Sequence, residues 1–128
     1  MKNYWYGKEI MTSFEEALDD VTIALWQEWF GVMTKINMKE KMKEKLGKYI
    51  EEYMILWACN PFLANKALEV EYEIWLLLPC NVIVYKRDWR VFASTILASS
   101  LVNNIDNEII REVAEEADKK LKKVIDNI

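Results

Sequence analysis

Apolar residues recur at two different spacings along the chain, and these spacings predict the order of its strands and helices. Alternation of apolar and polar positions predicts four strands, at residues 3–10, 30–36, 79–85 and 89–97. Apolar residues at steps of three and four predict four helices, at residues 13–28, 38–46, 61–71 and 106–126. The continuous apolar run at residues 53–59 predicts a further strand, which we expect to be central and buried on both faces.

Polar residues and a proline mark where three of the helices begin. Ser13 and Glu16 have capping-box spacing, in which both side chains bind backbone N–H groups left free at a helix start. Asn37 and Asn60 are the expected caps of the next two helices. Pro61 suits the first position of a helix, where its missing N–H costs nothing.

The predicted order of elements is β-α-β-α-β-α-β-β-α. This order indicates an α/β fold of the α+β kind, with a single compact domain over residues 1–128. We expect one mixed sheet with the helices packed on it.

Three segments are less regular. The second helix has a narrow apolar stripe of Met38, Met42 and Leu46, and we expect this stripe to attach an otherwise charged helix to the surface. Residues 72–78 are consistent with either a longer third helix or a strand. Gly7 is a candidate for a β-bulge in the first strand.

Composition and charge exclude several classes of function. The chain has 128 residues and a net charge of −4, so it lacks the basic excess with which a general nucleic-acid binder displaces counterions. It has no histidine, which excludes histidine-dependent catalysis and histidine-containing metal sites. The start of the chain lacks the apolar core of a signal peptide, and the longest apolar run, residues 74–80, is too short to span a membrane. We therefore expect a cytoplasmic protein that binds neither nucleic acid nor membrane.

The two cysteines are the first candidates for chemistry, because Cys59 and Cys80 are each followed by an asparagine. One interpretation is a thiol pair that is redox-active or binds a soft metal, since Cys59 precedes a helix start, where the dipole and free amides lower a thiol pKa. The other interpretation is two small buried residues at strand ends. Antiparallel third and fourth strands would bring the thiols to one edge, whereas parallel strands would place them at opposite ends of the sheet. Nothing else in the sequence completes a metal shell, so we expect no metal and no cofactor.

Three polar residues near the cysteines are further candidates. Asn60 is most simply a helix cap. Asn81 lies on an otherwise apolar strand, where a buried amide without partners costs on the order of 1–3 kcal/mol, so it either ties neighbouring backbone together or faces a cavity. Glu71 is the carboxylate that we favour for acid–base or hard-metal chemistry, against the alternative that it lies on a solvated face.

The two cysteine motifs also carry a family resemblance. Ala58-Cys59-Asn60-Pro61 and Leu77-Leu78-Pro79-Cys80-Asn81-Val82 are similar to motifs of the domain-of-unknown-function 302 family of bacteria and archaea. Supporting motifs are Phe30-Gly31-Val32, Lys43-Glu44-Lys45-Leu46-Gly47 and Ala67-Leu68-Glu69. The resemblance extends from Ser13 to Tyr85. It implies a compact α/β domain, often one per chain and dimeric, with no established activity or cofactor.

Trp57 and Trp75 depart from the family pattern, because relatives usually have a smaller residue, often glycine, at these positions. Any pocket that relatives have there is expected to be narrowed or lined by indole rings in this chain. Six tryptophans and six tyrosines are more than a small core easily encloses, and partly exposed aromatic residues are typical of interfaces. We expect a subunit contact formed by Tyr4, Trp5, Tyr6, Trp26, Trp29 and Trp89, against the alternative that these residues pack mainly in the core.

The leading hypothesis is a homodimeric domain that binds a small ligand or a partner, without catalysis and with no catalytic residue assigned. The candidate ligand-binding residues are Trp57, Cys59, Asn60, Glu71, Trp75, Cys80 and Asn81. The alternative hypothesis is a thiol-dependent redox or soft-metal-handling protein that uses Cys59 and Cys80.

Overall fold

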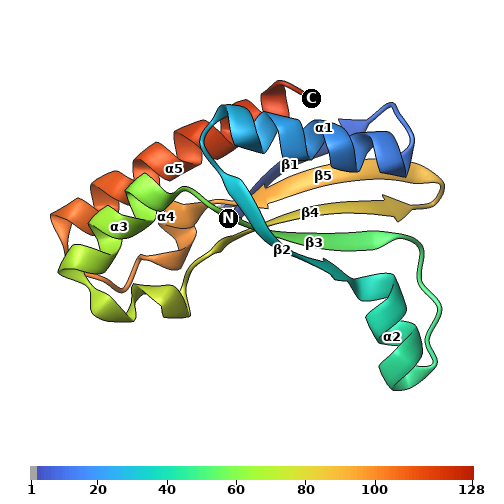
Figure 1. Cartoon of the computed structure of the whole chain (residues 1–128), viewed down its shortest axis with the longest axis horizontal. Helices are drawn as coiled ribbons and strands as arrows, with labels where there is room; N and C mark the ends of the chain where they lie inside the picture. The colour runs from blue at the N-terminus through green and yellow to red at the C-terminus, as the bar shows by residue number, and fades with distance from the viewer. Residues whose placement is uncertain (1–2) are drawn as a thin grey trace.

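The strands and helices of the structure begin and end close to where the sequence predicts them. In the computed structural model, which describes residues 3–128, the strands are β1 (Trp5–Ile10), β2 (Gly31–Asn37), β3 (Tyr53–Cys59), β4 (Cys80–Arg87) and β5 (Arg90–Ile96). The helices are α1 (Phe14–Gln27), α2 (Met38–Leu46), α3 (Pro61–Val70), η1 (Tyr72–Leu76), α4 (Ala98–Leu101) and α5 (Glu108–Asp126). The predicted order is confirmed, with two short additions (Figure 1). The 3-10 helix η1 occupies the segment that the sequence left undecided, and α4 lies in the last connector.

The predicted caps are present at the starts of α1, α2 and α3. The Ser13 hydroxyl accepts a hydrogen bond of 3.1 Å from the backbone N–H of Glu16. The Asn37 side-chain oxygen accepts one of 3.1 Å from the N–H of Glu40. Asn60 caps α3 in the same way. The starts of these helices are therefore confirmed, because each depends on a short-range hydrogen bond that the sequence already specifies.

The five strands form one sheet in the order β1-β5-β4-β3-β2, and every neighbouring pair is antiparallel. The α+β fold is confirmed, but the sheet is not mixed as predicted. A two-residue turn, Asp88-Trp89, joins β4 to β5, and both of its residues have positive φ, as tight hairpins require. The connection from β3 to β4, residues 60–79, turns back at the end of the sheet where β3 ends, so these strands also run antiparallel.

One face of the sheet is buried under α1 and α5 (Figure 1). Side chains alternate along the central strands, so Leu56 and Ala58 of β3 and Val82 and Val84 of β4 are fully buried on this face. The predicted orientation of the two valines is confirmed. The wall facing them on α5 includes Ala114, Ala117, Leu121, Val124 and Ile125. This layer of side chains between sheet and helices is the main core.

The two long helices leave the other face of the sheet uncovered, and we call it the open face. Strand register assigns to it Trp5, Glu9, Thr34, Ile36, Tyr53, Ile55, Trp57, Asn81, Ile83, Tyr85, Phe92, Ser94 and Ile96. Of these residues, only Ser94 is buried. The prediction that β3 is buried on both faces is therefore wrong. An apolar run does not reveal whether a helix lies over each face, and here both long helices pack on the same one.

Helix α2 projects from the sheet instead of packing on it (Figure 1). None of its residues is buried, and the Leu46 side chain is 72% exposed. The expected surface position is therefore confirmed, and the attachment is made by Met38 and Met42 of the stripe, which are the only partly buried residues of α2, but not by Leu46. The predicted end of the helix is confirmed, because Gly47 adopts the left-handed conformation with a φ of 63°.

Gly7 allows β1 to approach β5 closely. These two strands pair without a break in register, so the bulge predicted at Gly7 is wrong; a register shift occurs instead between Val32 and Thr34 of β2. A Cβ atom at Gly7 would overlap the hydroxyl of Ser94 and lie 2.6 Å from the carbonyl oxygen of Ala93. The position therefore accepts no side chain unless the strands move apart.

Replacing Gly7 with alanine should destabilise the fold by about 1–3 kcal/mol, the usual cost of overpacking, because β1 must shift away from β5. Urea denaturation gives the free energy of unfolding. Gly31→Ala is the matched control, since nothing lies within 4 Å of a Cβ atom at that position. Equal stabilities of the two variants would show that the close approach at Gly7 is unimportant.

Candidate functional site

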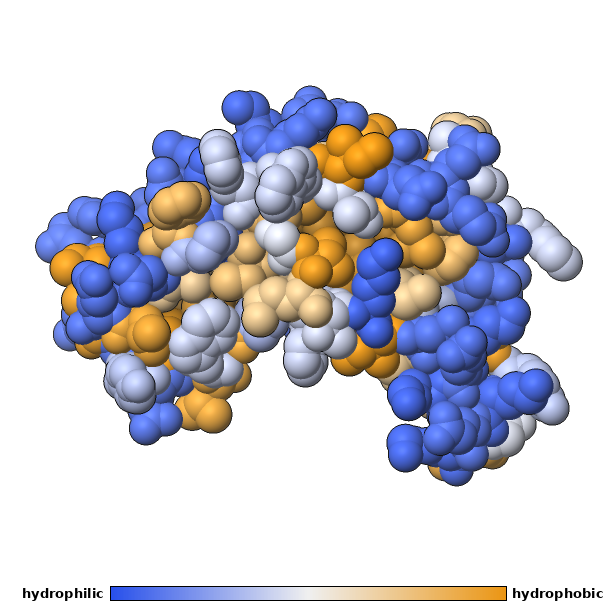
Figure 2. Space-filling model, viewed as in Figure 1, coloured by the Kyte–Doolittle hydropathy of each residue, from blue (hydrophilic) through white to orange (hydrophobic). Residues whose placement is uncertain are grey.

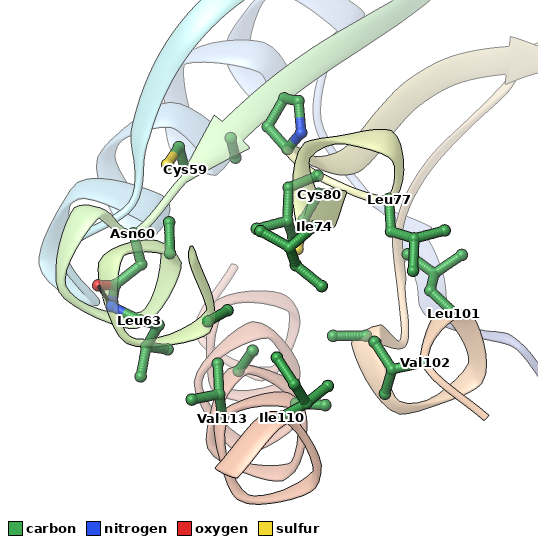
Figure 3. Close-up of a pocket in the computed structure, with 18 of the residues that line it drawn as sticks. Cys59, Asn60, Leu63, Ile74, Leu77, Cys80, Leu101, Val102, Ile110 and Val113 are labelled. Carbon is green, nitrogen blue, oxygen red and sulfur yellow. Dashed lines mark hydrogen bonds between the residues drawn. The ribbon is translucent and has the colours of Figure 1, made fainter. Parts of the chain in front are cut away.

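The two Cys-Asn motifs lie at the same end of the sheet, because β3 ends there and β4 begins there. Cys80 pairs with Ala58, the residue before Cys59. Successive residues of a strand point to opposite faces, so Cys80 faces the helices with Ala58, whereas Cys59 faces the other side. Figure 3 shows the Cys59 sulfur turned away from the cavity beside Cys80. The antiparallel strands therefore bring the cysteines to one edge but place their thiols, both free, on different faces.

Burial makes both thiols difficult to ionise. Desolvation raises the pKa of Cys80 to about 12, with smaller contributions from the nearby Cys59 and Asp118. Desolvation also raises the pKa of Cys59, which is opposite to the effect expected from the following helix start. Within residues 3–128, no group of three or more cysteine and carboxylate side chains is placed to hold a metal ion. The thiols thus lack both the common face and the ionisation that redox or soft-metal chemistry requires.

Asn60 has a complete set of structural hydrogen bonds. Its side-chain oxygen accepts from the backbone N–H groups of Phe62 (3.1 Å) and Leu63 (3.2 Å). Its side-chain nitrogen donates to the carbonyl oxygen of Glu28 at 3.3 Å. Asn60 therefore caps α3 and ties that helix to the end of α1, and its amide groups are already occupied.

A small apolar cavity lies beside Cys80, between the ends of β3 and β4 and the helices α3, η1, α4 and α5 (Figure 3). Leu63, Ile74, Val102 and Ile110 are among its lining residues, nearly all of which are apolar. Its volume is about 50 Å³. An apolar cavity that binds benzene has about 150 Å³. The cavity is therefore a small void in the core rather than a ligand site.

Glu71 and Trp75 lie outside this cavity, at the turn between α3 and β4. The Glu71 carboxylate accepts a hydrogen bond of 3.2 Å from the backbone N–H of Glu73 and so caps η1. Trp75 is an exposed residue of η1. The structure consequently separates both residues from the two thiols, with which the sequence grouped them.

Asn81 and Trp57 lie together on the open face, where they form a cross-strand pair. Both side chains are exposed. The expectation that Asn81 is a buried amide is therefore wrong, and within residues 3–128 no hydrogen bond holds its side chain. Asn81 is exposed because it lies between the buried Cys80 and Val82 in β4, and neighbouring residues of a strand point to opposite faces.

A wide hollow lies on the open face next to Asn81, with a volume of about 520 Å³. Its lining residues are Tyr4, Trp5, Tyr53, Asn81, Ile83, Tyr85, Lys86, Arg87, Ser94, Thr95 and Ile96. This volume falls within the roughly 300–1,000 Å³ that is common for ligand pockets. The hollow combines aromatic walls with the Asn81 amide and the basic Arg87.

Three stacked rings cross the middle of the open face. The ring centroids of Tyr53 and Tyr85 are 5.2 Å apart, and those of Tyr85 and Phe92 are 5.3 Å apart. The Arg90 guanidinium lies 5.4 Å from the Phe92 centroid, and two hydrogen bonds of 2.6 and 3.1 Å hold it to Glu9. Each ring pair contributes roughly 0.5–1.5 kcal/mol beyond its burial, so the stack helps to hold these side chains in place. Sequence reasoning missed this stack, because it depends on the register that pairs Tyr53 with Tyr85 and Tyr85 with Phe92.

The aromatic residues expected at one subunit contact lie on several surfaces. Trp5 is on the open face, whereas Tyr6 faces the helices and donates a hydrogen bond of 2.6 Å to Asp126. Trp26 is exposed on α1, and Trp89 is in the turn between β4 and β5. A single contact cannot include all of them, so Trp5 and its neighbour Tyr4 are the members that fit an interface on the open face.

Comparison with known proteins places this fold in a family. The model for DUF302, a domain of unknown function, matches residues 6–128. The chain belongs to the DUF302 family. A crystal structure of an uncharacterized conserved protein DUF302 from Bacillus stearothermophilus is similar over 97% of both chains, with a TM-score of 0.90 and 26% sequence identity. None of the curated proteins matches the chain.

The DUF302 match confirms the family resemblance and extends it. The sequence motifs covered residues 13–85, whereas the family model also includes β5 and α5. The open face is therefore part of the DUF302 domain itself. Membership supports a domain of unknown function and assigns no activity. No helix within residues 3–128 is long and apolar enough to cross a membrane.

The thiols of this DUF302 protein should react slowly in the native state. At neutral pH we expect Ellman's reagent to leave Cys80 unmodified, because it is buried and its raised pKa keeps it protonated. Cys59 should react more slowly than a free thiol, and both should react at once in denaturant. The absorbance of the released thiolate measures both rates. Rapid loss of both thiols from native protein, or a disulfide between them, would instead support the thiol-pair hypothesis.

Proposed function

We propose that this DUF302 protein is a non-catalytic binding domain. In this proposal it acts as a homodimer joined through the open face, and a small ligand binds in the hollow on that face. The observation that carries the proposal is the uncovered aromatic and apolar side of the sheet.

The open face leaves apolar groups in water that a partner would bury. Trp5 and Trp57 are exposed, and Ile55, Ile83 and Ile96 are half-buried. A contiguous apolar patch of this kind is uncommon on monomers and typical of interaction sites. Removing apolar surface from water contributes about 25 cal/mol per Å². The cost of leaving this face uncovered therefore favours association.

The size of the face suits a second copy of the chain. Five strands spaced about 4.8 Å apart, with strands about 24 Å long, give a flat area of roughly 570 Å². Side chains that protrude from the sheet, and the segments that project at either end, add to this area. A stable interface buries about 800 Å² on each partner. The area that association through the open face would bury is consequently of the order that a stable dimer requires.

The hollow favours a planar, negatively charged ligand. Tyr53, Tyr85 and Trp5 provide aromatic walls, while Arg87 provides positive charge at one side. A small aromatic carboxylate could stack on the rings and interact with the Arg87 guanidinium. Dimerisation through the same face would exclude water from the hollow and strengthen these interactions.

The titratable groups Glu9 and Tyr53 of the open face support binding rather than acid–base catalysis. The hydrogen bond from Arg90 holds the pKa of Glu9 below its usual value. Desolvation raises the pKa of Tyr53 above its usual value. A general acid or base works best with a pKa near the operating pH, and both shifts move these groups away from neutrality.

Light scattering should give a mass of twice the 15.2 kDa of one chain. Ile83→Lys should convert the dimer to a monomer, because it places a charge in the middle of the apolar face. Ile23→Lys is the matched control, since Ile23 is exposed on α1, on the other side of the molecule. Thermal unfolding confirms that both variants fold. A monomeric wild-type protein at high concentration would refute the dimer.

Ligand binding is tested separately by titrating isotope-labelled protein with benzoate and following backbone amide resonances. We expect shifts at Asn81 and Ser94, with weaker binding in Arg87→Gln and unchanged binding in the control Arg111→Gln. Benzyl alcohol, which lacks the carboxylate, should bind more weakly than benzoate. A titration without shifts on the open face would refute the ligand site and leave the dimer to be judged by its mass.

A further inference from the structure

Two segments project on the side of the sheet away from α1 and α5, one at each end of the molecule's long axis (Figure 1). We call residues 38–50, which are α2 and the turn after it, the basic arm. We call residues 69–76, which are the end of α3 together with η1, the acidic arm. Between the two arms the outline of the molecule is hollowed (Figure 2).

The two arms carry opposite charges. The basic arm contains five lysines and two glutamates, which give a formal charge of +3. The acidic arm contains three glutamates and no basic residue, which gives −3. The net charge of the whole chain is −4. Each arm thus concentrates in one short segment a charge nearly as large as that of the whole protein.

The basic arm packs only weakly on its own chain, through the partly buried Met38 and Met42. Helix α2 has nine residues, none of which is buried. Isolated helices shorter than about 12–15 residues are only marginally stable in water. Leu46 and Tyr49 are 72% and 79% exposed, and an exposed ion pair of 2.9 Å links Lys39 of the arm to Glu52, the residue before β3. Exposed ion pairs contribute little, so the arm has much to gain from an outside surface.

The acidic arm presents such a surface. Ile74 is buried and anchors η1 to the core, whereas Tyr72 and Leu76 are 83% and 82% exposed. Glu69 and Glu73 are exposed beside them. The arm therefore offers apolar groups flanked by carboxylates, which is complementary to a helix that carries an apolar stripe among lysines.

Symmetry determines which arms can meet when two copies face each other. A two-fold axis along the long axis of the molecule would place each arm against the same arm of its partner. A two-fold axis across the long axis exchanges the ends, so each basic arm meets an acidic arm. Like charges at close range are unfavourable, and unlike charges attract and orient the partners. The charge distribution therefore favours the second arrangement.

We propose that in the homodimer the basic arm of each copy docks on the acidic arm of its partner, so that the two copies clasp each other at both ends. This inference rests on the proposed dimer. Such an isologous contact forms twice and closes the assembly at two copies.

Cross-linking between two variants tests the arrangement of the arms. Protein with Lys45→Cys is mixed with protein carrying Glu73→Cys, and the mixture is oxidised mildly. We expect covalent dimers in the mixture and few with either variant alone, because like arms lie at opposite ends. The native cysteines interfere little, since Cys80 is buried and Cys59 is half-buried with a raised pKa. Efficient cross-linking of Lys45→Cys alone would overturn the proposed arrangement.

Charge reversal tests the attraction itself. The double variant Lys41→Glu, Lys45→Glu should weaken the dimer about tenfold or more, and adding Glu69→Lys, Glu73→Lys should restore it. The matched control is Lys119→Glu, Lys123→Glu on α5, which has the same four-residue spacing and should leave the dimer unchanged. Light scattering over a dilution series gives the dissociation constants.

The outcomes separate this inference from the function on which it rests. A wild-type monomer would refute the dimer and the docking of the arms together. A stable dimer that is unaffected by reversal on the basic arm, or equally weakened by the control on α5, would refute the docking and leave the open-face dimer in place. Restoration by the compensating variant is the result that only direct contact between the two arms explains.

Discussion

The antiparallel pairing of β3 with β4 is the constraint on which the rest of the structure depends. It requires residues 60–79 to leave and re-enter the sheet at the same end, so α3 and η1 are built there as a projecting turn. The pairing of Ala58 with Cys80 also determines which residues of both strands face the helices and which face the open side. Consequently Cys80 enters the core, and Asn81 is exposed on the open face beside Trp57. The faces on which Trp57, Cys80 and Asn81 lie follow from this one register.

The sheet is stabilised from one side, and this asymmetry links folding to association. Leu56, Val82 and Val84 are fully buried against α1 and α5, so the domain obtains a core without using its second face. The second face has instead an aromatic stack, with Tyr85 between Tyr53 and Phe92. These rings contact one another but still meet solvent, which makes the face ordered before any partner arrives. A pre-ordered surface loses less conformational entropy on binding than a flexible one.

Much of the fold could be predicted from the sequence because its signals are local. The caps at Ser13, Asn37 and Asn60 act within three residues, and hydrophobic periodicity acts within one element. The open face could not be predicted in the same way, because covering a strand depends on helices distant in the sequence. Gly7 shows a similar limit, since only the register with β5 reveals that Ser94 lies opposite. Of the candidate residues, Asn81 and Trp57 lie on the open face, whereas Cys80 lies in the core.

The repeated Cys-Asn dipeptide shows why residue identity alone did not locate the site. In Cys59-Asn60 the asparagine follows the last residue of a strand, so its amide is free to cap the next helix and becomes buried. In Cys80-Asn81 the asparagine is the second residue of a strand, so alternation turns it to the open face. The asparagine of the same dipeptide is therefore buried in one motif and exposed in the other. The Trp57 indole ring follows the same alternation, because it adds apolar area on the open face beside Asn81 and does not line the small cavity at Cys80.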